Sequence, residues 1–289
     1  MHPDRITLGP LALADTVVWV DMDDPGFAAI ASWSFTDLVV NSDTAGNSKG
    51  PVIRFDVRGP TTPGGNWGIW RDGEPCETAM IEGYVLFHLQ WEFNRIVLER
   101  RTATVHAACV ELSGRAFILC GASRSGKTTF AGWLSSQGAG YVADEIVTVT
   151  ADLKALHYRR PLGLRYDGPL DSLFNHPPQI DRRFDSYEML VPVSSLGATS
   201  MPEDPLPVGG LVFPRVEPGV PSSISAVAKS EAFERLCHNA PGIGRHGRHV
   251  FQRLAGLVRS IPTVELVTTD LPEARRLLMA LADESVVPA

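Results

Sequence analysis

Residues 116 to 129 read AFILCGASRSGKTT, and this stretch decides the fold. An apolar run comes first, and the residues 121 to 128 that follow match the pattern G-x-x-x-x-G-K-[ST] in full. The next residues, through about Gln137, read as a helix that ends at a glycine. A buried strand, a glycine-bearing loop and a helix in this order predict a P-loop (Walker A) in an α/β fold.

The residue types of the loop explain how it could bind a nucleotide. Gly121 and Gly126 allow the backbone to curl so that successive amide N–H groups face phosphate oxygens. Lys127 supplies an ammonium group for the β- and γ-phosphates, and the hydroxyl of Thr128 can ligate Mg²⁺. We therefore expect ATP and Mg²⁺ as cofactors. The expected nucleotide-binding residues are Gly121, Ala122, Ser123, Arg124, Ser125, Gly126, Lys127, Thr128 and Thr129.

Two acidic residues and a histidine complete the candidate site. Asp144 and Glu145 follow a short apolar run, so the strand after the P-loop helix is expected to end in two carboxylates near the phosphates. One carboxylate can assist Mg²⁺ while the other accepts a proton from an attacking hydroxyl; a helix cap or a solvated strand end is the alternative. His106 lies in the preceding strand, and a turn at Ser113-Gly114 would fold that strand toward the P-loop strand. A histidine of the core is the alternative there.

These residues together resemble a known family. His106-Ala107-Ala108, the loop GASRSGKTT and the run YVADE over 141 to 145 are similar to the catalytic domain of HPr kinase/phosphorylase, a P-loop fold related to phosphoenolpyruvate carboxykinase. The resemblance is strong from about Val105 to Val149, weaker to the C-terminus, and does not extend to residues 1 to about 95. It implies that Asp144 is the base that deprotonates a serine hydroxyl. It also implies that His106 assists this base and that Thr128 and Glu145 contribute to the metal site. The resemblance further implies that the chain can form a homo-oligomer.

Two residues depart from the family pattern. Arg124 stands where these proteins usually have glycine, and Thr129 stands where the bifunctional enzymes carry an acidic residue. These departures favour a kinase without reverse phosphorolysis, which acts on a serine of a peptide or protein other than HPr. Two alternatives stay open: a small-molecule kinase, and a nucleotide-binding regulatory or scaffold protein without transfer activity.

Composition narrows the function classes further. The chain has 289 residues, of which 44% are hydrophobic and 20% charged, which suits a packed core. A formal net charge of −7 gives no general attraction to nucleic acid or anionic lipid. No apolar run reaches the roughly 18 residues of a membrane-spanning helix, and the first residues lack the order of a secretory signal. We expect a cytoplasmic protein that binds neither nucleic acid nor membrane.

The chain divides into three expected segments. Residues 1–77 contain short β-like runs separated by turn-forming residues and predict a small β-rich N-terminal module. Apolar residues recur at helical spacing over 78–100 and predict a connecting helix. Residues 101–289 would form the P-loop kinase domain, of the HPr kinase and phosphoenolpyruvate carboxykinase type.

Overall fold

The computed structural model describes residues 5–41, 43, 50–101, 103–165, 168–173, 188–197, 201–202, 204–241 and 243–286. The chain forms two compact units. Unit 1 comprises Met1–Arg100 and Arg160–Pro192, and unit 2 comprises Arg101–Arg159 and Val193–Ala289. The division after Arg100 coincides with the expected start of the kinase domain, whereas the assignment of Arg160–Pro192 to unit 1 was not expected. Among the described helices, none is both long and apolar enough to cross a membrane.

Unit 1 is built on a five-stranded sheet with the order β1-β2-β3-β4-β5. Its strands are β1 (Ile6–Leu13), β2 (Thr16–Met22), β3 (Val52–Arg58), β4 (Trp67–Arg71) and β5 (Glu74–Met80). Strands β2 and β3 are parallel, and the other neighbours are antiparallel. The parallel connection carries helix α1 (Pro25–Ser34), which begins where the Asp24 side chain accepts a hydrogen bond from the Phe27 N–H at 2.7 Å.

The helix expected over 78–100 is shorter than predicted. It is α3 (Val85–Arg100), because the residues before it complete strand β5 or form a short 3-10 turn. The apolar face of α3 packs on the unit 1 sheet: the ring centroid of Phe93 lies 5.0 Å from that of Phe35 and 5.6 Å from that of Phe55. This helix therefore belongs to the core of unit 1. The remaining described elements of unit 1 are η1 (Thr36–Leu38), η2 (Glu82–Tyr84), β12 (Leu162–Arg165), η3 (Asp171–Leu173) and β13 (Glu188–Val191).

Unit 2 contains a nine-stranded sheet with the order β6-β10-β11-β14-β8-β7-β9, in which β16 pairs with β14 and β15 with β16. Strands β8, β14 and β16 are mutually parallel. Strand β7 is antiparallel to both β8 and β9, so β9 runs in the same direction as β8. The carboxyl ends of β8, β9, β14 and β16 therefore point to one edge of the sheet, where ligands of open α/β sheets bind. The strands are β6 (Thr104–Val105), β7 (Ala107–Leu112), β8 (Arg115–Cys120), β9 (Gly140–Ala143), β10 (Val147–Val149), β11 (Lys154–Leu156), β14 (Leu206–Val216), β15 (Ser223–Ala226) and β16 (Thr263–Thr268).

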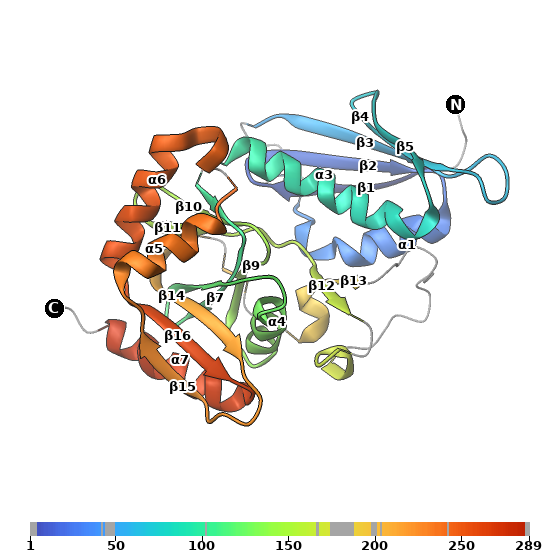
Figure 1. Cartoon of the computed structure of the whole chain (residues 1–289). Coiled ribbons are helices and arrows are strands. Elements are labelled where there is room, and N and C mark those ends of the chain that lie inside the picture. The colour runs from blue at the N-terminus through green and yellow to red at the C-terminus, as the bar shows by residue number, and fades with distance from the viewer. Residues whose placement is uncertain are drawn as a thin grey trace. The chain divides into compact units, whose positions relative to one another are not determined.

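Helices cover both faces of the unit 2 sheet (Figure 1). On one face, α4 (Lys127–Ser136) and α7 (Leu271–Val286) bury Leu134 and Leu278 in a core that includes Val264. On the other face, Arg235 of α5 lies 3.1 Å from the carboxylate of Glu265, the next residue of the same strand. The remaining helices are α5 (Lys229–His238), α6 (Ile243–Ser260) and η5 (Val193–Leu196). Unit 2 is an α/β unit, as the order of predicted strands and helices indicates.

Candidate functional site

A tight hairpin brings the strand that precedes the P-loop strand to the edge where the loop begins. Leu112 pairs with Arg115, and the two residues between them have positive φ angles of 51° and 76°, which suits a two-residue hairpin turn. At the other end of the hairpin Ala107 pairs with Cys120, the last residue before the loop. His106 therefore lies at the sheet edge that carries the P-loop, as predicted. It is half-buried, and its backbone N–H donates to the Asn239 carbonyl oxygen at 2.6 Å.

The loop over 121–126 curls as its sequence predicts. The Ser125 N–H donates to the Ala122 carbonyl oxygen at 3.2 Å, which closes a turn inside the loop. Gly126, the N-cap of α4, has φ 88°, and Arg124 has φ 67°. Glycine adopts this left-handed backbone freely, whereas an L-residue such as arginine does so at a cost. Arg124 therefore carries a backbone cost that a glycine at this position would not have.

Several groups of the loop suit a triphosphate. A Cβ placed on Gly121 would lie 2.8 Å from Ser125 Oγ, so a larger residue there would force the Ser125 hydroxyl to move. Ser125 Oγ is buried and has no hydrogen-bond partner among the described residues. The N-terminus of α4 has no side-chain cap, so its first N–H groups point outward as donors. Phosphate oxygens supply the acceptors that such donors need, and the helix dipole favours the same charge.

Lys127 holds a positive charge within the loop. The residue is 7% exposed, and its Nζ donates to the carbonyl oxygens of Gly121 at 2.8 Å and Ala122 at 2.9 Å. Burial lowers the pKa of Lys127, and nearby negative groups, the carboxylates of Asp144 and Glu145 among them, oppose this shift. The ammonium group is therefore placed beside the loop by contacts of the protein itself.

The acidic residue predicted to face the phosphates lies against the loop. Asp144 follows β9, is 3% exposed, and accepts a hydrogen bond from the hydroxyl of Thr128. Thr128 Oγ1 lies 3.2 Å from Oδ1 and 3.1 Å from Oδ2 of this carboxylate. In P-loop NTPases a loop serine or threonine and an aspartate at a neighbouring strand end hold Mg²⁺ together. The pair in this chain has the chemistry that such a site needs. Thr129, the next residue of α4, is half-buried.

Glu145 stands in a strained turn that the sequence did not reveal. Its φ is 63°, and the Ile146 N–H donates across it to the Asp144 carbonyl oxygen at 2.7 Å. A hydrogen bond over two residues with a positive φ at the centre is the rare, strained form of γ-turn. Strain of this kind concentrates at functional sites, where the surrounding fold imposes it. The turn sends the chain from β9 into β10 directly beside Asp144.

The metal site that these residues could form needs the nucleotide for its completion. Within the described parts of the chain, no group of three or more His, Cys, Asp or Glu side chains is arranged to hold a metal ion. Mg²⁺ in phosphoryl-transfer sites uses one or two protein groups together with substrate phosphates and water. Thr128 and Glu145 fit that kind of site, with the Asp144 carboxylate beside the Thr128 hydroxyl.

One neighbour of the loop escaped the sequence prediction. Val216, at the carboxyl end of β14, has its Cγ2 3.3 Å from the place that a Cβ on Gly126 would take. The run that contains it looks like an ordinary apolar strand. Only the pairing of β14 with β8 reveals that its last residues flank the loop.

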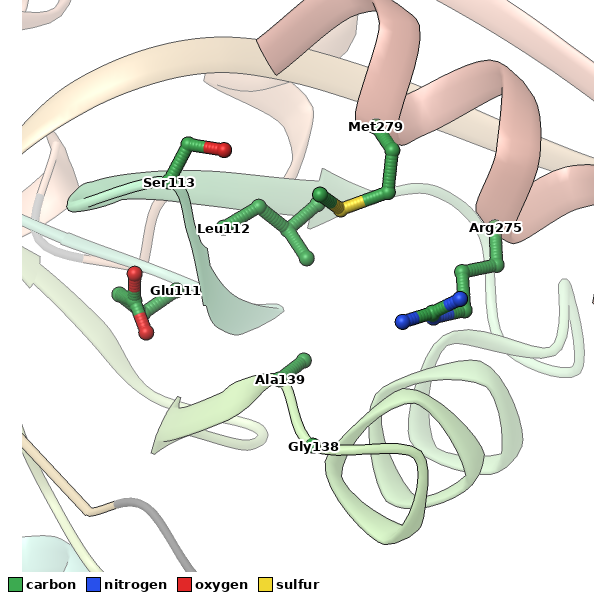
Figure 2. A pocket seen from close by; sticks show the side chains of 7 residues that line it. All are labelled: Glu111, Leu112, Ser113, Gly138, Ala139, Arg275 and Met279. Carbon is green, nitrogen blue, oxygen red and sulfur yellow. The ribbon is translucent and has the colours of Figure 1, made fainter. Parts of the chain in front are cut away.

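A small pocket lies at the other end of the sheet (Figure 2). It contains the hairpin turn at Ser113, which is the end of β8 opposite to the loop, and Gly138, which follows the end of α4 opposite to Lys127. Arg275 and Met279 reach into it from α7. This pocket is separate from the P-loop. Its lining residues are Glu111, Leu112, Ser113, Gly138, Ala139, Arg275 and Met279.

Comparison with models of known protein families gives no match, and comparison with curated proteins gives none either. The inference that this site binds a nucleotide therefore rests on the residues of the chain itself. The loop over 121–128, the contact between Thr128 and Asp144, and the position of His106 at the same sheet edge are the features that carry that inference.

Proposed function

We propose that this chain is an ATP-dependent kinase, similar to HPr kinase, that transfers the γ-phosphoryl group to a serine hydroxyl of a peptide or protein. The observation that carries the proposal is the contact of Thr128 with the buried carboxylate of Asp144 beside the phosphate loop. A phosphate loop alone supports nucleotide binding. A buried carboxylate at its Mg²⁺-binding hydroxyl supports phosphoryl transfer as well.

The loop and the first turn of α4 would bind the nucleotide. The donors for the β- and γ-phosphates would be the ammonium group of Lys127 and the loop amide N–H groups other than that of Ser125, which donates to the Ala122 carbonyl oxygen. Thr128 and Glu145 would hold Mg²⁺, which when bound neutralises charge on the phosphates. The contact with Thr128 also brings the Asp144 carboxylate close to this ion.

The transfer step needs one proton acceptor. The acceptor oxygen forms a bond to the γ-phosphorus while the bond from that phosphorus to the β–γ bridging oxygen breaks, and ADP leaves. Asp144 takes the proton of the attacking hydroxyl, as a general base within reach of the phosphates can do. His106, at the same sheet edge, would stabilise the charge on Asp144. The choice of a serine acceptor rests on the resemblance to HPr kinase.

Transfer of labelled γ-phosphate from ATP tests the proposal. The purified chain would be incubated with Mg²⁺ and with peptides encoded beside its gene, as wild type, Asp144→Asn and Asp152→Asn. Asp152 is the matched control, because it is an aspartate of the same unit that also accepts a threonine hydroxyl, from Thr150 at 2.6 Å, but on an exposed turn. We expect Asp144→Asn to keep ATP binding and to lose about 10²–10⁴-fold in transfer rate, and Asp152→Asn to behave as wild type.

A titration with Mg²⁺ separates the two roles that a carboxylate can have here. Glu145→Gln removes a proposed metal ligand, so its transfer rate should recover at high Mg²⁺ concentration. Asp144→Asn removes the proposed base, so its transfer rate should stay low even at saturating Mg²⁺. An Asp144→Asn protein that transfers at the parent rate shows that this residue is not the base. Intact ATP binding without label on any peptide would favour a small-molecule acceptor or a nucleotide-binding protein without transfer activity.

A further inference from the structure

Strand β14 extends beyond the P-loop strand at the edge of the sheet. Val212 of β14 pairs with Leu119 of β8, which ends one residue later, whereas β14 continues to Val216. The Pro214 carbonyl oxygen lies 3.8 Å from the place that a Cβ on Gly121 would take, so the last residues of β14 run alongside the loop. The end of β14 therefore borders the phosphate loop on this side.

This end of β14 exposes apolar side chains. Val216 is 56% exposed and Val220, in the turn after the strand, is 37% exposed. In the described part of unit 2 the only other large apolar side chain with such exposure is Phe251 of α6. Two of these three side chains therefore lie at the end of β14 and in the turn that follows it, and Val216 lies directly beside the phosphate loop. Exposed apolar residues gathered next to polar ligand-binding groups are typical of a ligand site.

The charges of the same connection argue against a further phosphate site. Arg215 forms ion pairs with Glu217 and with Glu265, the latter at 3.5 Å, so its guanidinium charge is already neutralised by two carboxylates. A phosphate group would be repelled by these carboxylates. An uncharged, flat group with an apolar face suits the surface better, because it can pack on the valines.

We propose that Val216 and Val220 form an apolar wall that packs against the base of the nucleotide whose phosphates occupy the P-loop. The inference rests on the proposed function, because it requires a nucleoside triphosphate in that loop. It adds a part of the site that the phosphate-binding pattern does not contain. The base of a nucleotide is an aromatic ring, so packing it on the valines removes apolar surface from water.

Binding of ATP compared with inorganic tripolyphosphate tests this wall. Both ligands would be titrated with Mg²⁺ into wild type and the double variant Val216→Ala/Val220→Ala, with isothermal calorimetry as the measurement. Removing four methyl groups should weaken ATP binding about tenfold, which is about 1.4 kcal/mol. Tripolyphosphate has no base, so its affinity should stay unchanged. Val52→Ala, a 63% exposed valine of β3 in unit 1, is the control and should alter neither affinity.

The outcomes distinguish the base wall from the phosphate loop. An ATP affinity that is unchanged in the double variant overturns the wall, and so does an equal loss for both ligands, which would reflect damage to the loop. A wild type that binds tripolyphosphate as tightly as ATP overturns the wall while the phosphate loop stands. A wild type that binds neither ligand overturns both proposals. Lys127→Met should lose both ligands, because it acts on the phosphates alone.

Discussion

Two glycines that border α4 allow a controlled test of the phosphate loop. Gly126 is the N-cap of this helix with φ 88°, and Gly138 follows its C-cap with φ 94°. An alanine in left-handed backbone costs about 1–2 kcal/mol. Alanine also reduces the freedom of the unfolded chain, which offsets roughly 0.4–1 kcal/mol of that cost. Each of the substitutions Gly126→Ala and Gly138→Ala should therefore destabilise unit 2 by about 1 kcal/mol.

The two positions differ in what surrounds them. A Cβ on Gly138 would meet no atom within 4 Å, whereas a Cβ on Gly126 would meet Val216 Cγ2 at 3.3 Å. That contact is with the end of an exposed side chain, which can turn away, so it adds little to the cost. What Gly126→Ala should change is the direction of the loop amides. We expect ATP affinity to fall at least tenfold, about 1.4 kcal/mol, in Gly126→Ala and to stay unchanged in Gly138→Ala.

Urea denaturation would measure the stability of both variants, and hydrogen exchange across α4 would report the local effect in unit 2. Calorimetric titration with ATP and Mg²⁺ would measure binding. Equal stability losses with binding lost only in Gly126→Ala would support a loop whose amides contact phosphate. If Gly126→Ala binds ATP as wild type does, or if both variants lose ATP equally, the amides at this position do not bind the nucleotide and the reasoning fails.

Two further predictions concern the core of unit 2. Burial raises the pKa of the thiols of Cys109 and of Cys120, that of Cys120 to about 12. Iodoacetamide at pH 8 should therefore label only the half-buried Cys76 and Cys237, which mass spectrometry would show. Label on Cys109 or Cys120 in the native protein would show that β7 and β8 open readily. Phe117 is fully buried, and its ring lies so close to Gly210 of β14 that a Cβ on Gly210 would be 2.9 Å away. Phe117→Ala should therefore lower the free energy of unfolding, measured by urea denaturation, by about 3–5 kcal/mol. A decrease below about 1 kcal/mol would contradict the packing of β14 on β8.

The parts of the site that the sequence predicts are those determined by neighbouring residues. The curl of the loop depends on the glycines within it, and the turn at Ser113-Gly114 fixes the pairing of β7 with β8. The prediction that this hairpin carries His106 to the loop edge is confirmed by the pairing of Ala107 with Cys120. The prediction that Asp144 lies near the loop is confirmed by its contact with Thr128. The roles of these residues in transfer stay predictions.

Other features depend on pairing between distant segments and were missed for that reason. Residues 78–80 were predicted as helix because apolar residues at helical spacing follow them, yet Met80 pairs with Trp67 and extends β5. The segment Arg160–Pro192 belongs to unit 1, where its strand β13 contacts α1, and no local signal in the sequence indicates that contact. The approach of Val216 to the loop depends in the same way on the register of β14 against β8.

The left-handed residues of the site connect its conformation to its function. Around the loop, Arg124, Gly126 and Glu145 all have positive φ angles, and only one of them is glycine. Glycine at the other two positions would remove a cost of about 1–2 kcal/mol each. A chain that keeps arginine and glutamate there retains the side chains despite the backbone strain, which is expected where the side chains serve function. Arg124 lies in the exposed part of the phosphate loop and Glu145 follows Asp144, so in the proposed function both side chains would lie beside the bound nucleotide and its Mg²⁺.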